Sequence, residues 1–229
     1  MNFKTLRFTN YIGNIAEKQN ERGIKMDHIF GLDSPLWNFM EKLSNVFILT
    51  LLWLLTSIPI VTIGASTTAL YYCTLKLTVD KDGYTVRSYF KSFKENFLQS
   101  TLAWLIIVAA SVILYMDFVW CINYGGSIGK SLLIVFTISV VLFTMVMSYV
   151  FPLIARCHTP LKNIFLWAFV MCIRNIHWSL LILVLTTGMI CIGFFVFWPV
   201  FFIGMGILAF FQSYFFNIVF TKYNLQLPD

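Results

Sequence analysis

Long apolar runs, separated by short charged segments, dominate the pattern of this chain. Between Lys42 and Lys76 lie 33 consecutive residues without a charge, positions 43–75. A single helix of that length would measure roughly 50 Å at 1.5 Å per residue, whereas the hydrocarbon core of a bilayer is about 30 Å thick. The run is therefore expected to break, and Pro59 and Gly64 in the sequence PIVTIG mark the place.

A second run, positions 175–221, holds 47 residues without Lys, Arg, Asp or Glu and is again about twice one span. Gly193 and Pro199 bracket its expected turn. The helix expected at 65–79 is short for a full span, so a re-entrant hairpin is the alternative there. The whole pattern predicts an all-α, polytopic transmembrane bundle of about six helices, at residues 44–63, 65–79, 96–120, 131–155, 178–194 and 199–220.

Two amphipathic helices are expected on the cytoplasmic face. In YTVRSYFKSFKENF the apolar residues Val86, Phe90, Phe93 and Phe97 are spaced four, three and four, with basic residues elsewhere on the wheel. A second such helix is expected to open with Thr159 as its N-cap and Pro160 as its first residue. The stretches KENFLQSTLAWLI and IRNIHWSLLILVL also resemble each other, since each has a basic turn, an Asn and then an apolar span with an early Trp. This similarity is consistent with a two-part internal repeat.

The distribution of Lys and Arg predicts the orientation in the membrane. The six-helix threading places 15 of the 16 basic residues on one side and only Lys130 on the other. Lys and Arg are concentrated in cytoplasmic loops, so both termini are expected in the cytoplasm. The net charge of +6 is explained by this topology and by anionic lipid, and no nucleic acid is expected as a partner.

Composition supports a cell-membrane location with the lipid bilayer as the first partner. Hydrophobic residues make up 59% of the chain and charged residues 11%, where soluble domains carry about 25% charge. A soluble domain of 229 residues has too little interior to bury so much apolar surface. Lipid is therefore expected to cover much of it.

The N-terminal region differs from the rest. Residues 1–29 are expected to form a disordered cytoplasmic tail, and residues 30–229 a single membrane-embedded domain. Glu21-Arg22-Gly23 can be encoded by a purine-rich sequence that resembles a ribosome-binding site, shortly before Met26. We hypothesise that Met26 is the natural start, with a genuine tail as the alternative.

No catalytic, cofactor or metal site is predicted, and no enzyme activity is expected. No charged residue falls at the middle of a predicted helix, and the motifs GxSxG, HExxH and GxxxxGK[ST] do not occur. The five cysteines form no CxxC pair and suit buried apolar positions. Asp117 lies near the outer end of the third predicted helix. It is either an interfacial carboxylate or a cation contact at an outer mouth.

The stretch TSIPIVTIGASTTALYY is the most distinctive in the chain, because hydroxyl-bearing and small residues surround its proline. Small residues let helices approach closely, and hydroxyls bond the backbone groups that proline leaves free. Two interpretations stay open, a tight structural hairpin and a broken helix that contacts a ligand. The candidate residues are Pro59, Thr62, Gly64, Ser66 and Thr67.

This stretch, above all SIPIVTIGA at 57–65, together with FGLDSPLWNF and SYVFPLIARC, resembles the YesL-like family of bacterial integral membrane proteins, a domain of unknown function. The resemblance runs from about Phe30 to the C-terminus. Members generally occur in Gram-positive bacteria, often beside genes for carbohydrate uptake. The resemblance implies an accessory or regulatory factor with a sugar ABC importer as partner, and it implies no catalytic residue. A transporter or channel-like protein is the alternative, although neither inner loop carries the E-A-A…G coupling motif of an ABC permease.

Overall fold

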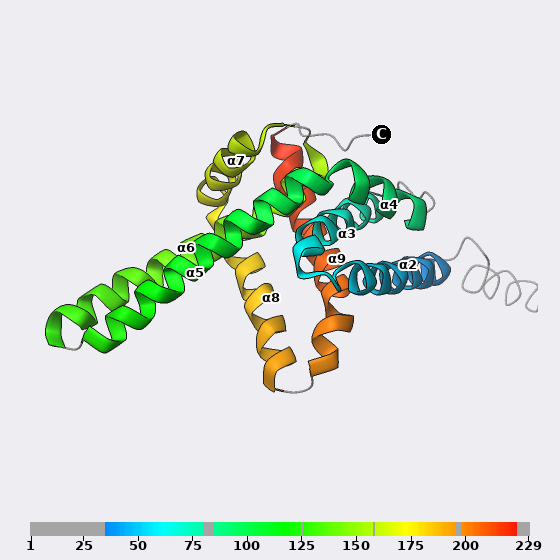
Figure 1. The fold of residues 1–229 in the computed structure, drawn as a ribbon. Helices are drawn as coiled ribbons and strands as arrows, with labels where there is room; N and C mark the ends of the chain where they lie inside the picture. Colours follow the sequence, from blue (N-terminus) through cyan, green and yellow to red (C-terminus); the bar gives the residue numbers. More distant parts are fainter. Residues whose placement is uncertain (1–34, 80–84, 125, 158, 196–197, 224–229) are drawn as a thin grey trace, which may run out of the picture. The chain divides into compact units, whose positions relative to one another are not determined.

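A computed structural model describes residues 35–79, 85–124, 126–157, 159–195 and 198–223, nearly all of them helical (Figure 1). The predicted all-α class is confirmed for these residues. The elements are α2 (Pro35–Thr56), η1 (Ile60–Thr62), α3 (Ile63–Leu77), α4 (Thr85–Glu95), α5 (Phe97–Tyr124), α6 (Gly126–Arg156), α7 (Leu161–Arg174), α8 (Ile176–Phe195) and α9 (Trp198–Lys222).

The chain divides into two compact units, Met1–Asn45 and Val46–Asp229. In the first, the Ser44 hydroxyl donates a hydrogen bond to the Glu41 carbonyl at 2.9 Å, within α2. The predicted tail at 1–29 and the hypothesis about Met26 lie outside the described residues. The contacts discussed below belong to the second unit.

The break predicted at Pro59 is confirmed. α2 ends at Thr56, and a turn and η1 precede α3, which begins at Ile63. Pro59 has an extended backbone, with φ −76° and ψ 118°. The Thr62 hydroxyl holds the turn, because its Oγ1 lies 2.6 Å from the Thr56 carbonyl oxygen and 2.7 Å from that of Pro59. It thus bonds the carbonyl at the end of α2, and it adds to the bond that the Thr62 backbone N–H donates to the Pro59 carbonyl at 2.9 Å.

Four helices of the described chain are long and apolar enough to cross a membrane. The prediction of a membrane protein is therefore supported, although the count of six spans is not reached. α3 has 15 residues, which is about 22 Å at 1.5 Å per residue and less than the hydrocarbon core of about 30 Å. The four segments are Phe97–Asn123, Leu132–Arg156, Ile176–Gly193 and Gly204–Lys222.

The neighbours of α3 favour the re-entrant alternative. A Cβ atom added at Gly64 would lie 2.5 Å from the Ser100 carbonyl oxygen and 2.7 Å from Trp104 Cβ, both near the start of α5. In the six-span threading, Gly64 and Ser100 would lie at opposite faces of the membrane. At the other end of α3, Thr78 is hydrogen-bonded to Asn217, shortly before α9 ends. Both ends of α3 therefore lie near one end of the spanning helices, as in a segment that does not cross.

The core lies where α3, α6 and α9 converge. The ring of Phe216 is edge-on to Tyr71 at 5.8 Å and to Tyr149 at 5.2 Å, and it stacks on Phe220. We call these four residues the aromatic layer. Tyr149, Phe216 and Phe220 are 0% exposed. Large rings in edge-to-face contact pack the space between helices densely.

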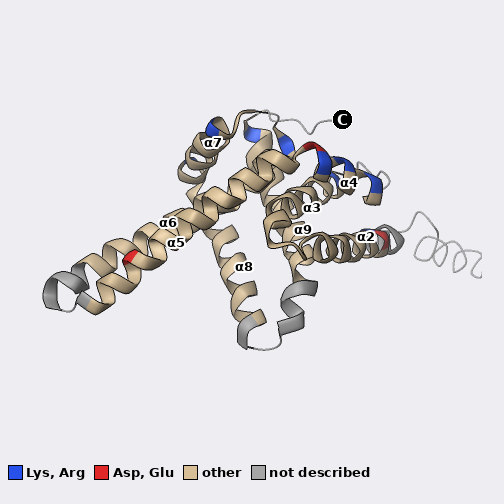
Figure 2. Ribbon diagram, in the orientation of Figure 1, with Lys and Arg blue, Asp and Glu red and all other residues tan. Residues whose placement is uncertain are grey.

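Basic side chains gather at one end of the second unit, in α4, α7 and the C-terminal turns of α6 and α9 (Figure 2). We call it the basic end. Arg156 donates to Asn217 Oδ1 at 2.6 Å and lies over the ring of Phe220. The Lys222 ammonium donates to Asn175 Oδ1 at 3.5 Å. These contacts join the ends of α6, α7 and α9.

The helix predicted around residues 84–97 exists as α4, and its contact with the membrane surface stays a prediction. Val86 and Phe90 are exposed, whereas Tyr89 and Ser92 are buried. The reason is that α4 packs along α3, where hydroxyl groups are available. The Tyr89 hydroxyl lies 2.7 Å from Thr56 Oγ1 and donates to the Ser66 carbonyl at 3.4 Å. These bonds hold one side of α4 on the hairpin, and they leave Val86 and Phe90 on the other side exposed.

Candidate functional site

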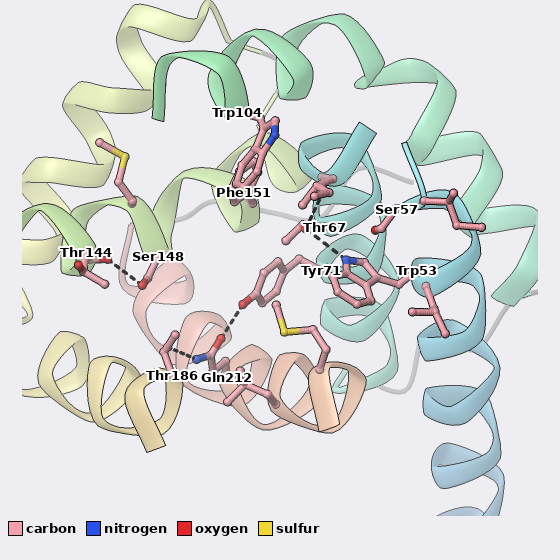
Figure 3. A pocket seen from close by; sticks show the side chains of 16 residues that line it. Trp53, Ser57, Thr67, Tyr71, Trp104, Thr144, Ser148, Phe151, Thr186 and Gln212 are labelled. Carbon is pink, nitrogen blue, oxygen red and sulfur yellow. Dashed lines mark hydrogen bonds between the residues drawn. The ribbon is translucent and has the colours of Figure 1, made fainter. Parts of the chain in front are cut away.

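A cavity of about 620 Å³ lies among α2, α3, α5, α6, α8 and α9 (Figure 3). This volume is within the range of roughly 300–1,000 Å³ that small-molecule sites occupy. No lining residue carries a charge. The lining residues are Trp53, Leu54, Ser57, Ile58, Ile63, Thr67, Tyr71, Trp104, Thr144, Met147, Ser148, Phe151, Thr186, Met205, Leu208 and Gln212.

A chain of hydrogen bonds crosses one wall of the cavity. The Tyr71 hydroxyl donates to Gln212 Oε1 at 2.5 Å, and Gln212 Nε2 donates to Thr186 Oγ1 at 2.9 Å (Figure 3). The bonds join α3, α9 and α8. Tyr71 and Gln212 are buried, so each polar group needs such a partner to offset its desolvation. The wall is therefore held in one arrangement.

The other hydroxyl groups of the wall also have partners within the protein. Thr67 Oγ1 donates to the Ile63 carbonyl at 2.7 Å and accepts a bond from Trp53 Nε1 at 3.3 Å. Thr144 and Ser148 donate to carbonyl groups four residues back, at 2.8 and 2.9 Å. The hydroxyl of Ser57 is the exception in this lining, since it is buried and has no hydrogen-bond partner among the described residues.

The cavity ends blindly toward the basic end. Tyr71 and Gln212 stand at its limit, and beyond them the other three rings of the aromatic layer fill the space between α3, α6 and α9. Among the lining residues, Phe151 lies five residues before the end of α6 and Met205 seventeen residues before the end of α9. At 1.5 Å per residue these positions are roughly 8–25 Å from the basic end. The cavity thus begins near the basic end and extends past the middle of the spanning helices.

Most of the predicted hairpin residues do not line the cavity. Only Thr67 does, while Pro59, Thr62, Gly64 and Ser66 lie outside its lining. Ser66 Oγ donates to the Thr62 carbonyl at 3.0 Å, within the turn itself. Gly64 was expected to allow close contact with the preceding helix, but its close neighbour is α5. These geometries favour the structural interpretation for all but Thr67.

Asp117 is not brought together with the hairpin. It is half-buried on α5 and lines neither the cavity nor a second one of about 370 Å³ between α5 and α6. Its contact with a cation at an outer mouth stays a prediction.

Sequence reasoning missed Trp53, Tyr71 and Gln212. For Gln212 a signal existed, because it is an amide within the long uncharged run 175–221, where an unbonded amide would be costly. Trp53 and Tyr71 have no such mark. Their spacing is that of any buried residue, and only the packing of α2 and α9 on α3 shows that they border a cavity.

The arrangement is suited to binding. The cavity lining contains no carboxylate, imidazole, thiol or amine that could move a proton or attack a substrate. In the described part of the chain, no three His, Cys, Asp or Glu side chains come together as metal ligands would. That the protein is not an enzyme stays a prediction.

Comparison with known protein families finds a match for part of the chain. A family model described as "Protein of unknown function, DUF624" matches residues 46–118, which covers the hairpin, α4 and most of α5. No curated protein and no solved structure matches the chain. The similarity to the YesL-like family stays a resemblance, and the description of the matched family states no activity.

Proposed function

We propose that this protein is a non-enzymatic membrane protein that binds a ligand in the cavity and acts as an accessory or regulatory factor. The observation that supports binding without passage is the blind end of the cavity. The rings of Tyr149, Phe216 and Phe220 are fully buried between the cavity and the basic end. A solute path would need either a gap in this layer or a large movement of α9.

The expected partner of such a factor is a sugar ABC importer, on the basis of the resemblance to the YesL-like family. The spanning helices have surface for a membrane partner, since α5 exposes Leu98, Ile113 and Met116, and α6 exposes Ile134 and Ile138. Lipid covers such surfaces equally well, so the partner has to be identified by experiment.

A transporter is the second candidate, because the walls of the cavity come from both α3–α5 and α6–α8. Many transporters place their substrate site between two repeated halves. The blind end and the uncharged lining favour the first proposal.

Two measurements separate the candidates. In the first, the protein is expressed with an affinity tag in its own cell and purified in mild detergent; we expect importer subunits to co-purify. In the second, liposomes that contain only this protein are loaded with a labelled mono- or disaccharide; we expect no release above empty liposomes. Sugar release that depends on the protein would replace the accessory proposal with the transporter.

The proposed location is the cell membrane, with the basic end and both termini in the cytoplasm. The support is the distribution of Lys and Arg, which a four-span threading with α2 and α3 on the inner side leaves unchanged at 15 to 1. Both ends of the chain stay on the same side, because four crossings are again an even number.

A further inference from the structure

We propose that the cavity holds one acyl chain of a membrane phospholipid, from the leaflet at the basic end. This inference rests on the proposed function, that the cavity is a binding site, and it names the chemical class of the ligand. The competing class is a sugar, which the resemblance to a carbohydrate-linked family would suggest.

The hydrogen-bonding state of the lining argues against a sugar. A sugar ring presents several hydroxyl groups, and each needs a partner once water is removed. The donors of Trp53, Tyr71 and Gln212 are already used within the protein. Those of Thr67, Thr144, Ser148 and Thr186 are bonded to carbonyl groups of their own helices. A sugar hydroxyl could donate to the remaining lone pairs of these oxygens, but it could accept a bond in this lining only from Ser57, whose hydroxyl has no partner among the described residues. An acyl chain needs no partner.

The shape and composition of the lining suit an apolar chain. Met147, Met205 and Leu208 provide flexible apolar surface, and the rings of Trp104 and Phe151 lie 6.4 Å apart. If a methylene group takes up roughly the 30 Å³ of a liquid water molecule, the cavity has space for about 20 of them. That is the length class of one phospholipid acyl chain.

The cavity lies where membrane lipid can reach it. Four of its walls, α5, α6, α8 and α9, are helices that can cross a membrane, so hydrocarbon surrounds them. Leu54 and Ile58 belong to the lining and are 39% and 74% exposed, which gives the cavity an apolar entrance from the side. Burying each methylene group contributes about 0.8 kcal/mol relative to water, but little relative to lipid. Occupancy therefore depends on how well the chain fits.

The first test compares two neighbouring positions of α9. Leu208 lines the cavity, while Ile207 is 43% exposed and does not. Leu208→Trp should fill the space, and Ile207→Trp should leave it open. After purification in mild detergent, we expect native mass spectrometry to find one retained phospholipid on the unmodified protein and on Ile207→Trp, and at least tenfold less on Leu208→Trp. Equal retention by the two variants would overturn the proposal.

The second test needs no variant. The unmodified protein is reconstituted in vesicles that contain a phospholipid with a photoactivatable acyl chain. We expect labelled peptides to include Met147 and Met205, and labelling there to persist when the vesicles contain excess labelled or unlabelled sugar. Labelling confined to exposed residues such as Ile113 would overturn the proposal. Loss of cavity labelling on addition of a sugar would also overturn the acyl-chain proposal, but the cavity would still be a binding site. Sugar flux in liposomes would instead overturn the proposed accessory function and would not bear on the acyl chain.

Discussion

The two consecutive three-helix segments α3–α4–α5 and α6–α7–α8 are alike at the joint between their second and third helices. At this joint stands a buried Asn, Asn96 in the first segment and Asn175 in the second. Each side-chain Nδ2 donates to the carbonyl four residues back, of Ser92 at 3.1 Å and of Met171 at 3.2 Å. Each of these carbonyls, in the last turn of its helix, accepts both the backbone and the side-chain N–H of the Asn, at the point where the chain passes into the next helix.

One turn after the joint, both segments place a buried serine against their own first helix. Ser100 Oγ donates to Thr68 Oγ1 of α3 at 2.9 Å. Ser179 Oγ lies 2.8 Å from the hydroxyl of Tyr149 in α6. The internal repeat expected from the two similar stretches is therefore matched in geometry at equivalent positions.

The first helices of the two segments differ. α3 has 15 residues, almost all buried, whereas α6 has 31 and contains one of the four potential spans. Both end on a cation over a ring, Lys76 over Tyr72 at 4.6 Å and Arg156 over Phe220 at 5.1 Å. The two segments therefore repeat the joint and the cation at the basic end. They differ in the first helix, which is long enough to cross the membrane only in the second segment.

The largest expected effect is the presence or absence of cysteine labelling from outside the cell. This labelling shows whether α3 crosses the membrane. Single cysteines are placed at Ile60, Asn123 and Lys94 in a cysteine-depleted background, since all three side chains are exposed. On intact protoplasts, an impermeant maleimide should label Asn123→Cys only. Ile60→Cys should stay unlabelled, because the hairpin does not reach the outer face.

Labelling of Ile60→Cys from outside would support the six-span topology and would show that α3 crosses the membrane as α6 does. Labelling of Lys94→Cys but not Asn123→Cys would reverse the orientation. Neither outcome depends on the stability of the variants, because the readout is taken only from protein that reaches the membrane.

The second prediction breaks the contact of α3 with α5. Gly64→Leu places atoms where Ser100 and Trp104 already lie, and backbone at this contact cannot move aside easily. We expect a loss of about 3 kcal/mol or more, seen as a large drop in monodisperse yield in detergent. Gly188→Leu is the matched control, because a Cβ there meets nothing within 4 Å. Equal yields would show that the close approach does not matter.

Sequence alone predicts the helices well and the site poorly, for physical reasons. The apolar runs and Pro59 place four spans and the hairpin break, because lipid imposes length and composition on a helix. Whether α3 crosses the membrane could not be decided from the sequence, since its residues suit a span and a buried helix equally. The cavity residues Trp53 and Tyr71 come together only through tertiary packing, which no local periodicity encodes.

The third prediction concerns Asn217, the residue that joins both segments to α9. Its Nδ2 donates to the Leu75 carbonyl and to Thr78, and its Oδ1 accepts from Arg156. Asn217→Leu leaves a mostly buried guanidinium without this acceptor, at a cost of about 2–3 kcal/mol. Thermal unfolding followed by circular dichroism in detergent measures it. Asn163→Leu, on the exposed side of α7, should change stability by less than about 0.5 kcal/mol.

The fourth prediction compares the two joints directly. Asn175 bonds beyond its own segment, to the Tyr223 hydroxyl at 3.1 Å and to Lys222. Among the described residues, the side chain of Asn96 bonds only to Ser92. We expect Asn175→Ala to destabilise by about 2 kcal/mol and Asn96→Ala by about 1 kcal/mol in the same unfolding assay. A larger loss for Asn96→Ala would mean that the bonds to α9 contribute nothing.

An effect as small as that of Asn96→Ala is expected at pH 8 for Tyr89, whose position in the second segment is taken by Ala168. Tyr89→Phe removes the contact with Thr56 and should cost about 1 kcal/mol at pH 8. Burial raises the pKa of Tyr89 from 10.0 to about 12, against smaller opposite effects of its bonds to Thr56 and Ser66. Between these two values the unfolded chain loses the proton while the folded protein keeps it. The contribution of Tyr89 is therefore complete below pH 10 and is lost as the pH rises toward 12.

At pH 11 the loss should be about 1.4 kcal/mol relative to pH 8, which is enough to cancel the advantage of tyrosine over phenylalanine. The free energies of unfolding of the two proteins, measured in parallel at pH 8, 10 and 11, should therefore approach each other at pH 10 and cross before pH 11. Other tyrosines and lysines titrate in both proteins alike, so the difference between the two isolates Tyr89. A difference that stays constant from pH 8 to 11 would mean that the hydroxyl of Tyr89 is open to water, and that α4 does not pack on α3 through it.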